Sequence, residues 1–149
     1  MSVLLAAAQA VMSVPATPAP ALPPVTGNYS IVVARAVEQA DPIAIDCGLE
    51  FCTSWFRGKF DQARTLAGNP LPAEFNARIE MGSPFNMRYH LLLLVAREPD
   101  GALRVRSQTG FDGRTKEGCL DARDTVALTP EPSGPDLFKR GQAICTIER

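Results

Sequence analysis

The sequence predicts an all-β protein, a small β-barrel or sandwich of about five to seven strands, stapled by disulfides and preceded by a disordered N-terminal arm. Several short segments alternate apolar and polar residues with a period of two, and turns containing Gly and Pro separate them. No segment has a helical period of convincing length. A chain of 149 residues has room for a single core.

The N-terminal region predicts export. The first charged side chain is Arg35, and residues 3–14 form an apolar segment as long as the core of a signal peptide. Small alanines follow, so we expect residues 1–21 to be a signal peptide and the protein to be periplasmic or secreted. The positively charged start of a signal peptide is missing. A start further upstream, or a disordered arm on a cytosolic protein, is therefore an alternative.

A proline-rich segment separates this region from the β domain. Five prolines lie between Pro15 and Pro24, and they would interrupt a membrane-spanning helix, so we expect no stable membrane span. We assign residues 22–28 to an extended linker and residues 29–149 to a single β domain.

The β domain contains segments with the pattern of strands. They are residues 29–38, 53–66, 74–81, 89–97, 102–108, 125–129 and 142–148. The first should end before Asp41 and Pro42, because proline cannot donate to the ladder. In the second, Phe56 and Phe60 share one face, and Gly58 between them marks a bulge or a tight bend.

The central segments are the clearest. Residues 74–81 alternate regularly, and residues 89–97 contain a continuous apolar run that suits a strand covered on both faces, although a short buried helix is the alternative. The turn-rich residues 97–101 should join this strand to residues 102–108 in a hairpin. Residues 110–124 read as a polar loop, residues 125–129 as a candidate short strand, and residues 142–148 as a final edge strand.

The cysteines are Cys47, Cys52, Cys119 and Cys145. Their spacing fits no zinc ribbon, and a plant-type iron–sulfur site would need a cysteine at Trp55. We therefore expect no metal and no cofactor. An even number of cysteines in an exported chain favours disulfides.

The pairing of the cysteines is open. If residues 47–52 are extended, Cys47 and Cys52 lie about 16 Å apart, and each must pair with Cys119 or Cys145. Closing such a long loop is worth roughly 4 to 5 kcal/mol, against about 2 kcal/mol for the short one. We expect the distant pairing, which would tie the C-terminal third to the barrel. Gly48 keeps the local pair open, because glycine could turn the backbone.

The charge distribution indicates no nucleic-acid partner. The formal net charge is -1, from 15 basic and 16 acidic residues spread along the chain without blocks. Two aromatic residues, Trp55 and Tyr89, could line a binding face, although ordinary partial burial is the more common explanation for such residues.

Catalytic signals are weak. His90 is the only histidine, so a triad hydrolase would need it as the base, and the usual nucleophile and phosphate-binding motifs are missing. Carboxylates cluster in one glycine-containing loop, at Asp112, Glu117, Asp121 and Asp124, but basic residues are interleaved with them and the spacing matches no calcium loop. We assign no catalytic residue.

Two segments, WFRGKFDQARTLAGNPLPAEFNARIEM at residues 55–81 and YHLLLLVAREPDG at residues 89–101, carry a resemblance. Their order of strands and turns resembles the small secreted OB-like barrels of the netrin and tissue-inhibitor-of-metalloproteinase type, over about residues 51–108. The resemblance implies an OB-like barrel. That family carries a cysteine at the mature N-terminus, where this chain has a proline-rich arm, so no inhibitory residue is carried over.

These observations favour an exported, non-catalytic β-barrel module that binds another envelope or extracellular protein or has an accessory role. One alternative is a small hydrolase or metal-dependent enzyme that uses His90 or the acidic loop from Asp112 to Asp124. The other is an OB-type module that binds a sugar or a single-stranded nucleic acid.

Overall fold

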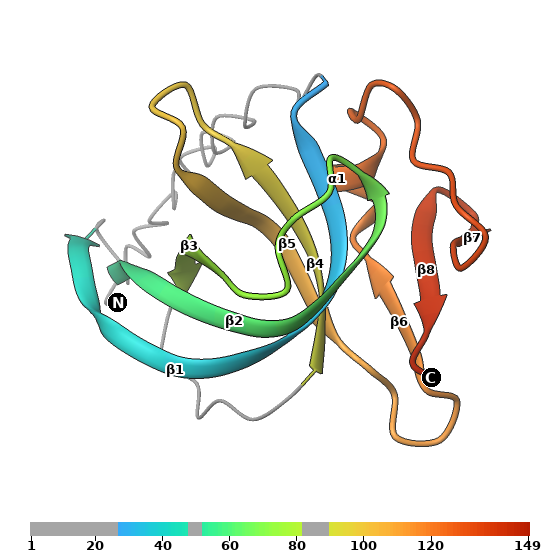
Figure 1. Cartoon of the computed structure of the whole chain (residues 1–149), viewed down its shortest axis with the longest axis horizontal. Helices are drawn as coiled ribbons and strands as arrows, with labels where there is room; N and C mark the ends of the chain where they lie inside the picture. Colours follow the sequence, from blue (N-terminus) through green and yellow to red (C-terminus); the bar gives the residue numbers. More distant parts are fainter. Residues whose placement is uncertain (1–26, 48–51, 82–89) are drawn as a thin grey trace, which may run out of the picture.

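The computed structural model describes residues 27–47, 52–81 and 90–149, and only the backbone of residues 38–47, 52–54 and 81. These residues form the elements seen in Figure 1: β1 (Tyr29–Cys47), β2 (Cys52–Gly68), β3 (Phe75–Met81), β4 (His90–Arg97), β5 (Leu103–Gly110), β6 (Glu117–Leu120), α1 (Ala122–Thr125), β7 (Phe138–Arg140) and β8 (Ala143–Ile147). The expected signal peptide at residues 1–21 lies outside the described residues, as does nearly all of the expected linker.

The strands form two sheets. β1, β2, β3, β5 and β4 close into a barrel in that order, and β6, β8 and β7 form a second, smaller sheet beside it (Figure 1). Neighbours in the barrel are antiparallel except β3 and β5, which run parallel. The predicted OB-like all-β fold is confirmed. The C-terminal strands do not join the barrel.

The barrel interior is filled by side chains that alternate along each strand. β2 contributes Phe56 and Phe60, β3 contributes Phe75 and Ile79, and β5 contributes Val105. The rings of Phe60 and Phe75 stack with their centroids 5.0 Å apart. The residues that alternate with these core residues along each strand therefore point outward, away from the barrel interior.

β4 is buried on both faces, as its apolar run predicts. Leu93 and Val95 pack inside the barrel. Leu92 and Leu94 point the other way, into a second cluster with residues such as Ile144 of β8. The small C-terminal sheet therefore covers the outside of β1, of β4 and of the C-terminal end of β2, which contributes to the same cluster.

The expectation that the first strand ends before Asp41 is wrong, because β1 continues through Pro42 to Cys47. Up to Arg35, β1 pairs with both β2 and β4, and beyond it β1 pairs with β2 alone among the residues that the structure describes. Within that part of the chain, Pro42 lies in an edge portion, and the register shifts on both sides of it. An irregular edge is where a strand tolerates a residue without an N–H.

Two glycines shape β2. Gly58 pairs with Gln39 of β1. We predicted a bulge or bend at Gly58, and the register shift lies opposite it in the partner strand, between Gln39 and Pro42 of β1. A Cβ on Gly58 would come within 2.9 Å of the Phe60 ring, so the absent side chain makes room for that ring. Gly68 ends β2 with φ of 81°, and a Cβ there would lie 2.2 Å from the carbonyl oxygen of Tyr29.

The C-terminal third departs from the sequence expectations. Residues 125–129 do not form a strand, because Asp121 accepts a hydrogen bond from the N–H of Arg123 and caps the short helix α1. β6 lies in the segment that we expected to be a polar loop, and β7 lies in a segment for which we predicted no strand. β7 is exposed throughout, so it leaves no alternating pattern. β8 is the central strand of its sheet rather than an edge.

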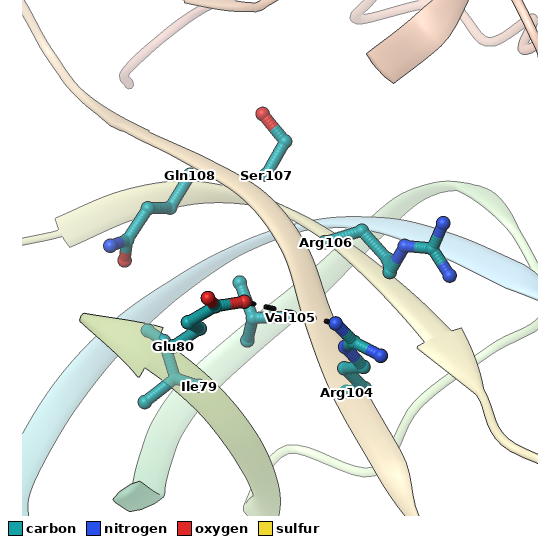
Figure 2. Close-up of a pocket in the computed structure, with 7 residues that line it drawn as sticks. All are labelled: Ile79, Glu80, Arg104, Val105, Arg106, Ser107 and Gln108. Atoms are coloured by element: carbon teal, nitrogen blue, oxygen red, sulfur yellow. Dashed lines mark ion pairs between the residues drawn. The ribbon is translucent and has the colours of Figure 1, made fainter. Parts of the chain in front are cut away.

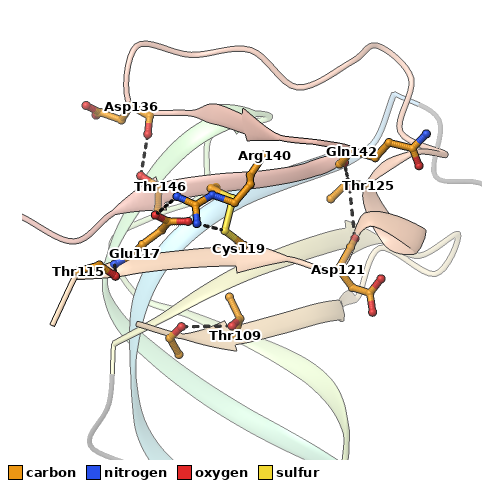
Figure 3. The surroundings of a disulfide bond; sticks show 12 residues. Thr109, Thr115, Glu117, Cys119, Asp121, Thr125, Asp136, Arg140, Gln142 and Thr146 are labelled. Atoms are coloured by element: carbon orange, nitrogen blue, oxygen red, sulfur yellow. Dashed lines mark hydrogen bonds and ion pairs between the residues drawn. A yellow bond between two sulfur atoms is a disulfide. The ribbon is translucent and has the colours of Figure 1, made fainter. Parts of the chain in front are cut away.

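The expected distant pairing of Cys47 and Cys52 with the C-terminal cysteines is wrong. Cys119 of β6 and Cys145 of β8 bond to each other (Figure 3). They are directly opposite each other in the ladder between β6 and β8. The backbones of Cys47 and Cys52 are likewise opposite each other, at the hairpin end of β1 and β2. The disulfide therefore staples the small sheet internally and does not tie it to the barrel.

Candidate functional site

The outer face of β2, β3 and β5 carries a group of polar and basic side chains, which we call the basic face. Its residues alternate with the core residues of the same strands and so point away from the barrel interior. They are Trp55, Arg57 and Lys59 of β2, Asn76, Arg78 and Glu80 of β3, and Arg104 of β5. Four basic residues thus accompany one acidic residue, in a chain whose net charge is -1.

Three arginines lie side by side across the basic face. Arg57 is directly opposite Arg78 in the ladder between β2 and β3, and Arg78 is in register with Arg104 of β5. Neighbouring strands are about 4.8 Å apart, so the row places three positive charges over a backbone width of about 10 Å. Like charges directly opposite one another destabilise a sheet.

Acidic residues compensate this row only in part. Arg78 donates a hydrogen bond of 2.9 Å to Asp100, but both side chains are about half exposed, and such pairs are weak. Arg57 and Lys59 are exposed and make no salt bridge with any side chain that the structure describes. Glu38, which lies opposite Lys59 in the ladder with β1, is described by its backbone alone. The basic face therefore retains positive charge that an anion could neutralise.

Arg104 is held in place but incompletely hydrogen-bonded. Its guanidinium carbon lies 4.4 Å from the centroid of the Trp55 ring, a cation–π contact that reaches across β3. Its nearest carboxylate oxygen, on Glu80, is 3.8 Å away, which is too far for a hydrogen bond. Its Nε is buried without a partner among the described residues. A buried donor without a partner is costly, which makes Arg104 a strong candidate for binding an anion.

The two aromatic residues expected to line a binding face have different outcomes. Trp55 lies on the basic face and is half-buried there under Arg104. Tyr89 lies outside the described residues.

His90 lies at the start of β4, where it is partly exposed and does not point into the core. Its Nδ1 is 2.8 Å from a carboxylate oxygen of Glu148, and its Nε2 is 3.2 Å from the amide oxygen of Gln62. Gln62 has φ of 51° and lies at a bulge, where two residues of β2 against one of β1 separate the pairs Val33–Arg64 and Arg35–Asp61. Both ring nitrogens therefore contact side chains other than a nucleophile.

The carboxylates of the predicted acidic loop serve local turns. Asp112 accepts hydrogen bonds from the N–H groups of Arg114 and Thr115, which lowers the pKa of its carboxyl. Glu117 pairs with Arg140 of β7 (Figure 3). Asp121 pairs with Arg123 and caps α1, which lowers the pKa of its carboxyl to about 2.

Asp124, in the first turn of α1, completes the set. Within the described chain, these four carboxylates do not gather into a cation site.

One group of metal-ligating atoms comes close together among the described residues. It consists of Glu117, Cys119 and Cys145. Because the two cysteines form the disulfide, their sulfurs are not available as thiolates.

The residues that the structure describes contain no helix that is both long and apolar enough to cross a membrane.

The arginine row was missed by sequence reasoning. Arg57, Arg78 and Arg104 are far apart in the chain and form no run of basic residues. Each lies on the polar side of an alternating strand, which was visible, but only the order of the strands in the barrel brings them together. A barrel model with β3 beside β5 would have been needed to find the row.

Comparison with known proteins finds no matching protein-family model, no matching curated protein and no matching solved structure.

Proposed function

We propose that the protein is an exported, non-catalytic OB-like binding module whose basic face takes up an extended anionic ligand. The row of Arg57, Arg78 and Arg104 carries this proposal. A sheet loses stability when like charges are placed directly opposite each other, and sequences break such local rules mainly at functional sites. A ligand with several negative groups would relieve the repulsion along the whole row.

The position of the row supports an extended ligand. In OB barrels, the face around strands 2 and 3 is the usual place for chain-like ligands. Here the second sheet packs on the outside of β1, β4 and the C-terminal end of β2, away from β3 (Figure 1). A chain that crosses β2, β3 and β5 would meet the three arginines in succession.

Two further observations support the remaining parts of the proposal. The disulfide between Cys119 and Cys145 fits a chain that folds in an oxidising compartment, as export requires. The Nε2 of His90, which would face the nucleophile in a triad hydrolase, lies 3.2 Å from the amide oxygen of Gln62, which argues against that alternative.

The proposal is tested by removing charge from the basic face. The double substitution Arg57→Gln with Lys59→Gln removes two exposed charges two residues apart in β2. Arg114→Gln with Lys116→Gln is a matched control, because it removes two exposed charges at the same spacing in the loop between β5 and β6. Trp55 is the only tryptophan, so its fluorescence reports directly on the basic face.

Binding of polygalacturonate, polyglutamate and oligothymidylate should be measured by Trp55 fluorescence at several salt concentrations. At least one polyanion should bind, with an affinity that falls as salt rises. The variant on β2 should bind about 3- to 30-fold more weakly with a shallower salt dependence, while the control binds like the parent. Equal loss in both variants, or no binding of any polyanion, would contradict the proposal.

A further inference from the structure

A small cavity adjoins the arginine row, between β3 and β5. Among the described residues, these two strands pair at Arg78 and Arg104 alone and form no continuous ladder on either side of that pair. The cavity has a volume of about 150 Å³. Buried Ile79 and Val105 contribute apolar surface to it, and Glu80, Arg104, Arg106 and Gln108 contribute polar groups (Figure 2).

The size of the cavity indicates what it can hold. Pockets that enclose a whole drug-sized molecule are about 300 to 1,000 Å³, so this one suits a single unit of a longer chain. Its polar groups offer both kinds of hydrogen bond. The Glu80 carboxylate accepts, the Gln108 amide donates and accepts, and the Arg104 guanidinium donates. This mixture fits a ring that carries hydroxyl groups and one carboxylate.

Arg104 is the group in this cavity that most needs a partner. Figure 2 shows its guanidinium and the Glu80 carboxylate turned toward each other across the gap between the strands. The 3.8 Å separation leaves no hydrogen bond between them, and the Arg104 side chain is only 20% exposed. A planar guanidinium matches a planar carboxylate in a bidentate arrangement, and partial burial strengthens such a pair.

On the basis of the function proposed above, we infer that the ligand is an acidic polysaccharide of uronic acid units. One sugar ring enters the cavity between β3 and β5, and Arg104 binds its carboxylate. The hydroxyl groups of the ring hydrogen-bond to Glu80 and Gln108. The neighbouring units continue across the face to Arg78 and Arg57.

The mixture of polar groups in the cavity favours a polysaccharide over an acidic peptide. A uronate ring that enters the cavity brings hydroxyl groups to Glu80 and Gln108 as well as a carboxylate to Arg104. A glutamate side chain offers the carboxylate alone and would leave Glu80 and Gln108 without a ligand partner.

The aromatic content of the face argues against a single-stranded nucleic acid. OB surfaces that bind such strands stack successive bases on several aromatic rings. Among the described residues of the basic face, Trp55 is the one aromatic side chain, and Arg104 covers its ring.

The test uses ligands of equal length on the full chain: hexagalacturonate, its methyl ester, hexaglutamate and hexathymidylate. Hexagalacturonate should bind, and the other three should bind at least about 10-fold more weakly. A stronger response to hexaglutamate or hexathymidylate would overturn the inference and leave the proposed anion-binding function intact. Equal binding of the methyl ester would overturn the role of the carboxylate. No binding of any hexamer or longer polyanion would defeat both proposals.

The role of Arg104 is tested with Arg104→Lys, which keeps the charge but loses the planar fork. Binding of hexagalacturonate should weaken about 10- to 100-fold, while Arg114→Lys leaves it unchanged. If Arg104→Lys disturbs the fold, Gln108→Ala at the exposed rim provides a second test, with an expected loss of about 2- to 10-fold. Binding that is unchanged in the folded variants would overturn the assignment of the cavity.

Discussion

Arg35 of β1 and Asp61 of β2 face each other across the ladder of the barrel and are joined by two hydrogen bonds. Nε and Nη2 of Arg35 donate to the two carboxylate oxygens of Asp61 over 2.9 and 2.6 Å. The hydrogen bonds from Arg35 hold the pKa of the Asp61 carboxyl below its usual value of 3.8. The pair therefore links the stability of the barrel to pH.

The substitution Asp61→Asn should make unfolding less sensitive to acid. A carboxyl with a lower pKa in the folded than in the unfolded state adds stability above its unfolded pKa, and this is lost as pH falls through the folded pKa. The parent should therefore exceed the variant in urea midpoint at pH 7, and the difference should narrow as pH falls below about 3.8. Asp124→Asn on α1 is the charge-matched control. A difference that is constant from pH 7 to pH 2 would contradict the prediction.

Arg57→Gln should stabilise the free protein. It removes one of the two like charges that lie directly opposite each other at Arg57 and Arg78. We expect the free energy of unfolding to rise by about 0.2 to 1 kcal/mol at low salt, and by less at high salt, where the repulsion is screened. Urea titrations at two salt concentrations measure the change, with Arg114→Gln as the control. A loss of stability would mean that the arginine row is not strained.

Gly68→Ala should destabilise the junction between β2 and the turn that follows. The new Cβ would lie 2.2 Å from the carbonyl oxygen of Tyr29, and φ of 81° disfavours a side chain. We expect the free energy of unfolding to fall by about 1 to 3 kcal/mol. Gly113→Ala is the control, because nothing lies within 4 Å of its Cβ position. Equal stability of the two variants in thermal unfolding would show that the backbone at Gly68 adapts freely.

The sequence carried enough information for the barrel because alternation identifies each of its strands. Phe56 and Phe60 mark the inner face of β2, and the leucines of β4 mark a strand buried on both sides. The alternation fails where burial is slight or a strand is short. β7 consists of three residues, all of them exposed, and β6 is only four residues long. Neither strand therefore leaves a periodic signal in the sequence.

The candidate site was less accessible from the sequence, because it depends on which strands are neighbours. Trp55 could be singled out as an aromatic residue on a polar face, but its contact with Arg104 requires β5 to lie beside β3. The pairing of Cys119 with Cys145 was missed for a related reason. Loop-entropy arithmetic favoured long loops, whereas the register of β6 and β8 places these two residues directly opposite each other.

The same register argument predicts a second, local disulfide between Cys47 and Cys52. Their backbones are paired across β1 and β2, and the bond between Cys119 and Cys145 leaves them only each other as partners within the chain. Tryptic cleavage distinguishes the pairings cleanly, since both residues fall within peptide 36–57. Without reduction, that peptide should carry an internal bond, and peptides 117–123 and 141–149 should be linked to each other. Links from peptide 36–57 to either of the others would contradict the prediction.

The two disulfides should also differ in their effect on stability. The bond between Cys119 and Cys145 spans a sequence separation of 26, so replacing both by serine should lower the free energy of unfolding by about 3 to 4 kcal/mol. Replacing Cys47 and Cys52 should lower it by about 2 kcal/mol, because the loop is short. Urea unfolding of the two double variants measures both values.

Because the basic face lies on the barrel, the variant without Cys119 and Cys145 should still bind a polyanion under conditions in which it stays folded. Loss of binding by that folded variant would show that the small sheet helps to shape the basic face.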